Sequence, residues 1–264
     1  MGARSAILWV LVGCYNPTIA TEVPCGPNGE CPSNQHCDRG SNRCIDGDGG
    51  ALSDARPDIA IDAATMPSFL GYTYVDGTTP MTTIDAPPAT KAGDLLIAHV
   101  SDDATTIGNV ATPPGWTKVI ERNGVQDPHW AGIYYAFVTP TSPSADWTFP
   151  NVYNSIAVLA FSNVNANPID VADAIVVNDT MQPIAPSVTT TRANTILLVM
   201  FTQDLGQGAI GMIGGVTNVY SQAGALNAAG GYTLIPDAGP TGTHTAPVPM
   251  KGPSIGFSVA LAPL

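Results

Sequence analysis

Charged residues are scarce in this sequence of 264 residues, at 11% of the chain. Glutamate occurs only as Glu22, Glu30 and Glu121, so strong helix formers are few and a mainly helical fold is excluded. No cysteine follows Cys44, which excludes thiolate metal sites from most of the chain. The apolar run at residues 6–12 is too short to cross a bilayer. The net charge of −12 has the wrong sign for a phosphate backbone, so we expect no nucleic-acid partner.

What the chain does contain is typical of short strands joined by turns. Val, Ile, Thr and Tyr are plentiful, and 27 Gly and 24 Pro residues separate apolar runs. The run at residues 95–100 predicts a buried strand, and residues 196–201 repeat its pattern. We therefore predict an all-β fold: a single large antiparallel β-sandwich, jelly-roll-like and pseudo-duplicated, preceded by a disulfide-rich module and a disordered linker.

The repeat extends beyond this pair of strands. Four segments of the first half recur in the same order and at nearly constant offset in the second half. The pairs are 95–100 with 197–201, 115–120 with 216–220, 133–138 with 231–235, and 155–161 with 254–261. The alternative is that any all-β chain repeats apolar strands at this spacing.

The N-terminus has the pattern of a secretory signal. A short basic start precedes the apolar run, which ends in Leu11-Val12-Gly13-Cys14. This ending resembles the lipobox of bacterial lipoproteins, which implies a signal peptide over 1–13, lipid on Cys14 and an anchor spacer over 14–24. Tyr15 follows the cysteine where an inner-membrane retention signal has Asp, so the resemblance implies the outer membrane or cell surface. The shortness of the apolar run leaves an upstream start codon open.

Four cysteines remain if Cys14 carries lipid. Cys25, Cys31, Cys37 and Cys44 lie within a segment, 25–44, that has almost no apolar residues from which to build a core. In an exported chain, this arrangement predicts a module held by two disulfides. Of three possible pairings we favour Cys25–Cys37 with Cys31–Cys44. A zinc site that includes His36 is the alternative, although the close Cys-x-x-Cys pairs of zinc sites are missing.

Residues 45–66 are rich in Asp and poor in apolar side chains, which predicts an acidic flexible linker. The segment Asp46-Gly-Asp48-Gly lacks the remaining ligands of an EF-hand. A lipobox, a short Cys-rich knot and an Asp/Ala/Pro spacer together resemble predicted lipoproteins of myxobacteria. In such proteins the spacer would hold the following domain away from the membrane.

Residues 67–264 form the predicted sandwich. Its segments Gly93-Asp-Leu-Leu96, Thr112-Pro-Pro-Gly-Trp116 and Ala160-Phe-Ser-Asn-Val164 resemble an uncharacterised β-sandwich domain of bacterial surface proteins and phage tail proteins. The resemblance implies an architecture and no activity. Asn163 stands where the similar proteins usually carry Gly, which would alter that turn.

Two catalytic motif matches fail on their context. Gly252-Pro-Ser-Ile-Gly256 fits a nucleophile elbow, but no helix or His follows it. Gly206-Gln-Gly-Ala-Ile-Gly211 fits a dinucleotide loop, but a poor helix follows and the next acid is Asp237. His99 lies mid-strand, more simply packed or edge-exposed than catalytic. With Glu121 the only Glu of the domain, we expect no enzyme.

Two candidate binding sites remain, one for a sugar and one for calcium. Trp130 lies in a polar segment, where an exposed ring would stack on a sugar while Asp127 and His129 bind its hydroxyls; core packing is the alternative. Asp102, Asp103 and Asp204 follow matching strands and would hold calcium if the strand ends are neighbours; exposed acidic loops are the alternative. No other cofactor is expected.

These expectations combine into one predicted function. The protein would be a lipid-anchored cell-surface protein, held in the outer membrane through Cys14, whose non-catalytic sandwich binds a glycan or a surface protein. A purely structural coat module without a small ligand is the first alternative. A cryptic hydrolase that uses Asp carboxylates is the second.

Overall fold

The computed structural model describes residues 24–26, 30–31, 35–38, 43–46, 66–103, 110–124, 129–140, 144–151, 153–204, 208–224 and 226–264. The predicted signal peptide, Cys14, most of the linker and Asp127 lie outside this part of the chain. The chain divides into two compact units, Met1–Ile59 and Ala60–Leu264. Within the described ranges, no helix is long and apolar enough to span a membrane.

The first unit contains a two-stranded antiparallel ribbon of β1 (Gln35–Asp38) and β2 (Arg43–Asp46). Disulfides join Cys25 to Cys37 and Cys31 to Cys44, with Cα–Cα distances of 5.6 and 5.7 Å. The favoured pairing is thus confirmed, and the sulfurs that a zinc ion would need are bonded to one another. Each bridge closes a loop of 12 or 13 residues, which stabilises the unit by about 3 kcal/mol on chain entropy.

The second unit is all-β, as predicted, and every strand pairing in its sheets is antiparallel. Its first half contains β3 (Ser68–Gly77), β4 (Met81–Asp85), β5 (Leu95–Asp102), β6 (Thr117–Asn123), β7 (Trp130–Phe137), β8 (Ser144–Thr148) and β9 (Asn154–Ser162). Its second half contains β10 (Val164–Thr180), β11 (Ile184–Ala185), β12 (Thr195–Asp204), β13 (Thr217–Gln222), β14 (Leu226–Ile235), β15 (His244–Thr245) and β16 (Gly252–Pro263).

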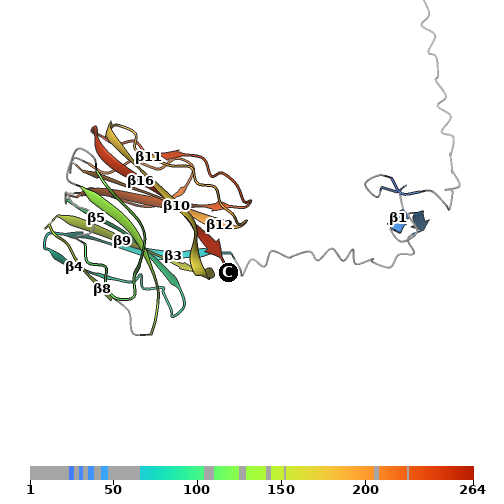
Figure 1. The fold of residues 1–264 in the computed structure, drawn as a ribbon, viewed down its shortest axis with the longest axis horizontal. Helices are drawn as coiled ribbons and strands as arrows, with labels where there is room; N and C mark the ends of the chain where they lie inside the picture. The colour runs from blue at the N-terminus through green and yellow to red at the C-terminus, as the bar shows by residue number, and fades with distance from the viewer. Residues whose placement is uncertain are drawn as a thin grey trace, which may run out of the picture. The chain divides into compact units, whose positions relative to one another are not determined.

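The strands form four layers (Figure 1). Two five-stranded sheets, ordered β3-β9-β5-β7-β6 and β10-β16-β12-β14-β13, face each other across a core that includes Leu95, Ile133, Phe161, Leu198 and Phe257. The ribbon β4–β8 covers the outer face of the first sheet, and the ribbon β11–β15 covers that of the second. The central strands β5, β9, β12 and β16 are therefore buried on both faces, which explains their unbroken apolar runs.

The two halves are copies of one seven-stranded motif. Adding seven to each strand number of the first sheet gives the order of the second sheet. In each half the first strand pairs with the last and the second with the sixth, a jelly-roll-like crossing. The register also breaks at the same places: Phe69/Gly71 corresponds to Ile169/Val171, and Lys118/Ile120 to Asn218/Tyr220. All four predicted correspondences follow this internal repeat.

The turn at Asn163 joins the two halves. Asn163 has φ of 58°, in the left-handed region that Gly enters freely and Asn tolerates better than most residues. Its carbonyl accepts a hydrogen bond from the Leu264 amide over 3.2 Å. Asn at this position therefore satisfies a backbone requirement that Gly would also meet.

Candidate ligand-binding site

A cavity of about 320 Å³ lies between the ribbon β4–β8 and the first five-stranded sheet. Most of its lining is apolar, from Ile84, Ala86, Leu96, Ala136, Phe137, Ala145 and Val158. Trp116 and Pro114 form one side, while Ser144 and Thr139 contribute hydroxyl groups. A mostly apolar hollow with a few polar groups is the usual form of a small-molecule site, and this one is at the small end of their range, about 300–1,000 Å³.

The Thr-Pro-Pro-Gly-Trp segment of the sequence builds this side of the cavity. The Trp116 amide donates to the Pro113 carbonyl over 3.2 Å, and Gly115 has φ of 85°. This is a type II turn, with Pro at its second position and Gly at the third, where a positive φ is required. The turn places the half-buried Trp116 ring edge-on to the buried Trp147, with 5.6 Å between ring centroids.

A second hollow, of about 280 Å³, continues from the cavity. Ala86 and Thr139 line both spaces, so the two are adjacent. Pro87, Pro88 and Pro140 contribute to the second hollow, together with the exposed Asp85. Among the described residues, Asp85 is the one ionisable residue that lines either space.

The second half carries the same motif with different side chains at this place. On the ribbons, the hydrogen bond from the Phe149 amide to Pro80 matches that from the Val248 amide to Met181, so His244 takes the place of Ala145. On the sheets, Ser258 takes the place of Val158. The His244 Nδ1–H donates to the Gly214 carbonyl over 2.9 Å, which connects β15 to the loop before β13. Ser258 donates to the Pro186 carbonyl over 2.6 Å, which connects β16 to the end of β11.

The turn that carries Trp116 recurs as well. Gly215 has φ of 78° and corresponds to Gly115, but the next residue is Val216. The His244 ring lies against Gly215, since a Cβ there would be 3.6 Å from the ring. In the second half, therefore, the His244 imidazole occupies the region that is hollow in the first half. The hydrogen bonds of His244 and Ser258 extend across that region.

The predicted sugar platform is not formed. Trp130 is 1% exposed and packs beside Tyr134, with 6.4 Å between ring centroids. His129 is 0% exposed, and burial lowers its pKa to about 4. The prediction of an exposed ring flanked by His129 is wrong, because the ribbon β4–β8 buries the face of β7 that carries Trp130. Asp127 lies outside the described residues.

The predicted calcium site is not formed either. Among described residues, one group of three His, Cys, Asp or Glu side chains has ligand atoms within 4.8 Å of one another, and it consists of disulfide cysteines. Asp102, Asp103 and Asp204 are described but are not brought together. Asp102 is 0% exposed, and burial raises its pKa to about 7, against the opposing effect of the Asn151 backbone. A three-carboxylate calcium site is therefore wrong.

His99 lies inside the sandwich. It is 2% exposed, and its Nδ1 is 2.6 Å from the Tyr220 hydroxyl of the facing sheet. The Phe257 ring packs edge-on against the imidazole at 5.7 Å. Burial lowers the pKa of His99 to about 3, so the imidazole is neutral near pH 7. The interpretation of His99 as a packed residue is confirmed, and its hydrogen bond joins the two halves.

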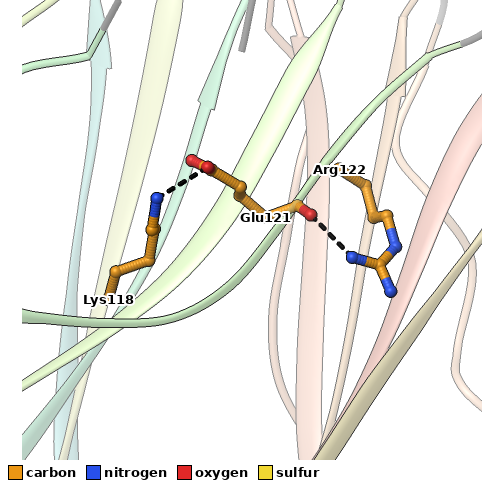
Figure 2. Close-up of polar contacts among 3 residues, drawn as sticks. All are labelled: Lys118, Glu121 and Arg122. Atoms are coloured by element: carbon orange, nitrogen blue, oxygen red, sulfur yellow. Dashed lines mark hydrogen bonds and ion pairs between the residues drawn. The ribbon is translucent and has the colours of Figure 1, made fainter. Parts of the chain in front are cut away.

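Glu121 and Ser254, which were weighed as catalytic residues, make structural contacts. Figure 2 shows that Lys118 donates to the Glu121 carboxylate over 2.7 Å, while Arg122 donates to the Glu121 carbonyl over 2.9 Å. Ser254 lies within the regular strand β16, is 1% exposed and donates to the Val177 carbonyl over 3.4 Å. A nucleophile elbow needs a sharp strand-to-helix turn, and Ser254 has none.

Comparisons with protein-family models, curated proteins and solved structures gave no match. Only the geometry of the cavity therefore supports a binding site here. The Pro-Pro-Gly-Trp motif indicates the turn before Trp116, but it gives no sign of the cavity beside it. The available signal was the difference between the repeats, since Trp116 corresponds to Val216 and Ala145 to His244.

Proposed function

We propose that this protein is an exported, lipid-anchored protein of the outer membrane or cell surface, and that its repeated β-sandwich is a non-catalytic ligand-binding module. The cavity beside Trp116 is the binding site. The single observation that supports binding is the contrast between the repeats: one motif, folded twice, is hollow in one copy and crossed by His244 and Ser258 in the other.

This contrast supports a function because the fold itself does not require the hollow. His at the place of Ala145 and Ser at the place of Val158 tie the ribbon to its sheet in the second copy. Unfilled apolar space forfeits packing contacts and lowers stability. The hollow that the first copy leaves between its ribbon and its sheet is therefore explained by occupancy.

Export and anchoring are supported by the disulfide-bonded first unit and by the lipobox-like sequence before Cys14. The test is metabolic labelling with a radioactive fatty acid, followed by membrane fractionation. We expect label in the intact protein and none in Cys14→Ser. Equal labelling of both proteins, or reduced Cys25–Cys37 and Cys31–Cys44 pairs in the isolated protein, would contradict this part of the proposal.

Binding is tested by screening small apolar fragments for a rise in melting temperature of the full chain. A ligand at 100 times its Kd stabilises the folded state by about 2.7 kcal/mol. Trp116→Val and Ala145→His copy the second half and should abolish the rise. Val216→Ala is the matched control in the second copy and should retain it. A rise that survives Trp116→Val and Ala145→His would place the ligand elsewhere.

A further inference from the structure

We propose that the ligand of this site is a small organic cation, with an uncharged ring-sized body in the cavity beside Trp116 and a protonated amine at Asp85. This inference deepens the proposed function and depends on it. The two adjacent hollows differ in chemistry, and each selects one end of such a molecule.

The cavity selects an uncharged body. Apart from hydroxyl groups, its lining offers hydrocarbon and the Trp116 ring, and no ionisable side chain of the described ranges lines it. A charge placed there would lose its hydration without gaining a partner, at a cost of several kcal/mol. A flat ring, in contrast, gains dispersion contacts with Trp116 and with the walls from Leu96 and Val158. The volume of about 320 Å³ matches a single small molecule.

The second hollow selects a positive charge. Its one ionisable side chain is Asp85, which is exposed and makes no ion pair within the described part of the chain. Ala86 separates Asp85 from the cavity by a single position, and Ala86 lines both hollows. A bound molecule whose body fills the cavity therefore extends past Ala86 into the second hollow. Its polar end then lies at the Asp85 carboxylate.

The charge of the whole protein favours the same sign. The chain carries 21 Asp and Glu against 9 Lys and Arg, a net charge of −12. Such a surface attracts cations and repels anions during encounter. An anionic ligand would meet both this field and Asp85, and neither hollow has a Lys, Arg or His in its lining to compensate.

The test uses three probes that share a phenyl ring: phenethylamine, 2-phenylethanol and 3-phenylpropionate. Binding to the full chain is measured by calorimetry and by tryptophan fluorescence at low salt. We expect phenethylamine to bind about two to five times more tightly than 2-phenylethanol, the effect of one solvent-accessible ion pair, and 3-phenylpropionate to bind most weakly. The preference for the amine should fall as salt rises.

Variants separate the two parts of the site. Asp85→Asn should remove the preference for the amine and leave 2-phenylethanol binding unchanged. Trp116→Val and Ala145→His should weaken both probes. Asp146→Asn is the matched control: Asp146 is exposed on β8, lines neither hollow and should leave the preference intact.

The outcomes distinguish this inference from the function on which it depends. If phenethylamine and 2-phenylethanol bind equally in a Trp116-dependent way, the binding site stands and the cationic class is wrong. If Asp85→Asn keeps the preference, the inference is also wrong. If no probe binds, both the small-cation class and the proposed small-molecule site are overturned.

Discussion

The hydrogen bond between His99 and Tyr220 predicts that the sandwich is weakened by acid in a defined range of pH. His99 is 2% exposed, and burial lowers its pKa from the ordinary 6.5 to about 3. The Tyr220 hydroxyl and the apolar Phe257 ring contact the imidazole, while Tyr74 and Tyr72 pack behind Tyr220. No carboxylate contacts the imidazole among these neighbours to stabilise its charged form.

The sign and size of the pH effect on folding stability follow from proton linkage. The unfolded chain binds a proton at His99 near pH 6.5, whereas the folded chain binds it only near pH 3. The contribution of neutral His99 is therefore complete above pH 6.5 and is lost as pH falls from 6.5 towards 3. Each pH unit in this range costs about 1.4 kcal/mol, so the loss between pH 7 and pH 4.5 is about 2.5 kcal/mol.

The variant His99→Met isolates this effect, because Met200 occupies the corresponding inward position of the second copy. At pH 7 the variant should be less stable by about 1–3 kcal/mol, since it leaves the Tyr220 hydroxyl buried without its partner. At pH 4.5 the difference should move by about 2.5 kcal/mol in favour of the variant. Urea unfolding of the full chain, followed by tryptophan fluorescence, measures both values.

The control is Tyr220→Phe, which removes the hydrogen bond and keeps the histidine. It should lower stability at pH 7 but retain the dependence on pH. Parallel stability curves for the wild type and His99→Met between pH 7 and 4.5 would show that His99 is protonated in the folded state, and would refute the argument.

Three further outcomes follow from the packing. Reduction of the disulfides should make the segment Cys25–Cys44 sensitive to protease without changing the melting temperature of the sandwich. The reason is that each bridge stabilises only the first unit, by about 3 kcal/mol. A lower melting temperature of the sandwich after reduction would contradict this. Gly256→Ala should cost about 3 kcal/mol in urea unfolding, since a Cβ would overlap the Ile184 carbonyl, whereas Gly214→Ala, with its nearest contact at 3.9 Å, should not. Burial raises the pKa of Asp102 to about 7, so the wild type loses stability as pH rises from 3.8 towards 7; Asp102→Asn should gain steadily over the wild type in that range, and a constant difference would be inconsistent.

The strands and the repeat could be predicted because their signals are local. Runs such as Leu95–Val100 are apolar at every position, and only a strand buried on both faces explains such a short unbroken run between turn residues. The disulfide pairing was accessible for a similar reason, since four cysteines within 25–44 allow three combinations. The Pro-Gly pair before Trp116 also indicates a type II turn.

The burial of Trp130 and the separation of the acidic side chains could not be predicted in this way. The ribbon β4–β8 covers the face of β7 that carries Trp130, and no local pattern reports this long-range cover. Leu95 corresponds to Ile196, so Asp102 corresponds to Gln203 and not to Asp204. A shift of one residue sends a side chain to the opposite face of a sheet. Strands that match in sequence therefore did not bring their carboxylates together.

The differences between the two copies carry more information about function than their similarity. Shared features, such as the bulges at Phe69 and Ile169, are requirements of the fold, because both copies keep them. Where the copies differ, the fold is satisfied either way, and another constraint decides the residue. Trp116 against Val216 and Ala145 against His244 are differences of this kind, and both concern one cavity. Two substitutions that copy the second half onto the first should thus remove binding while they preserve the sandwich.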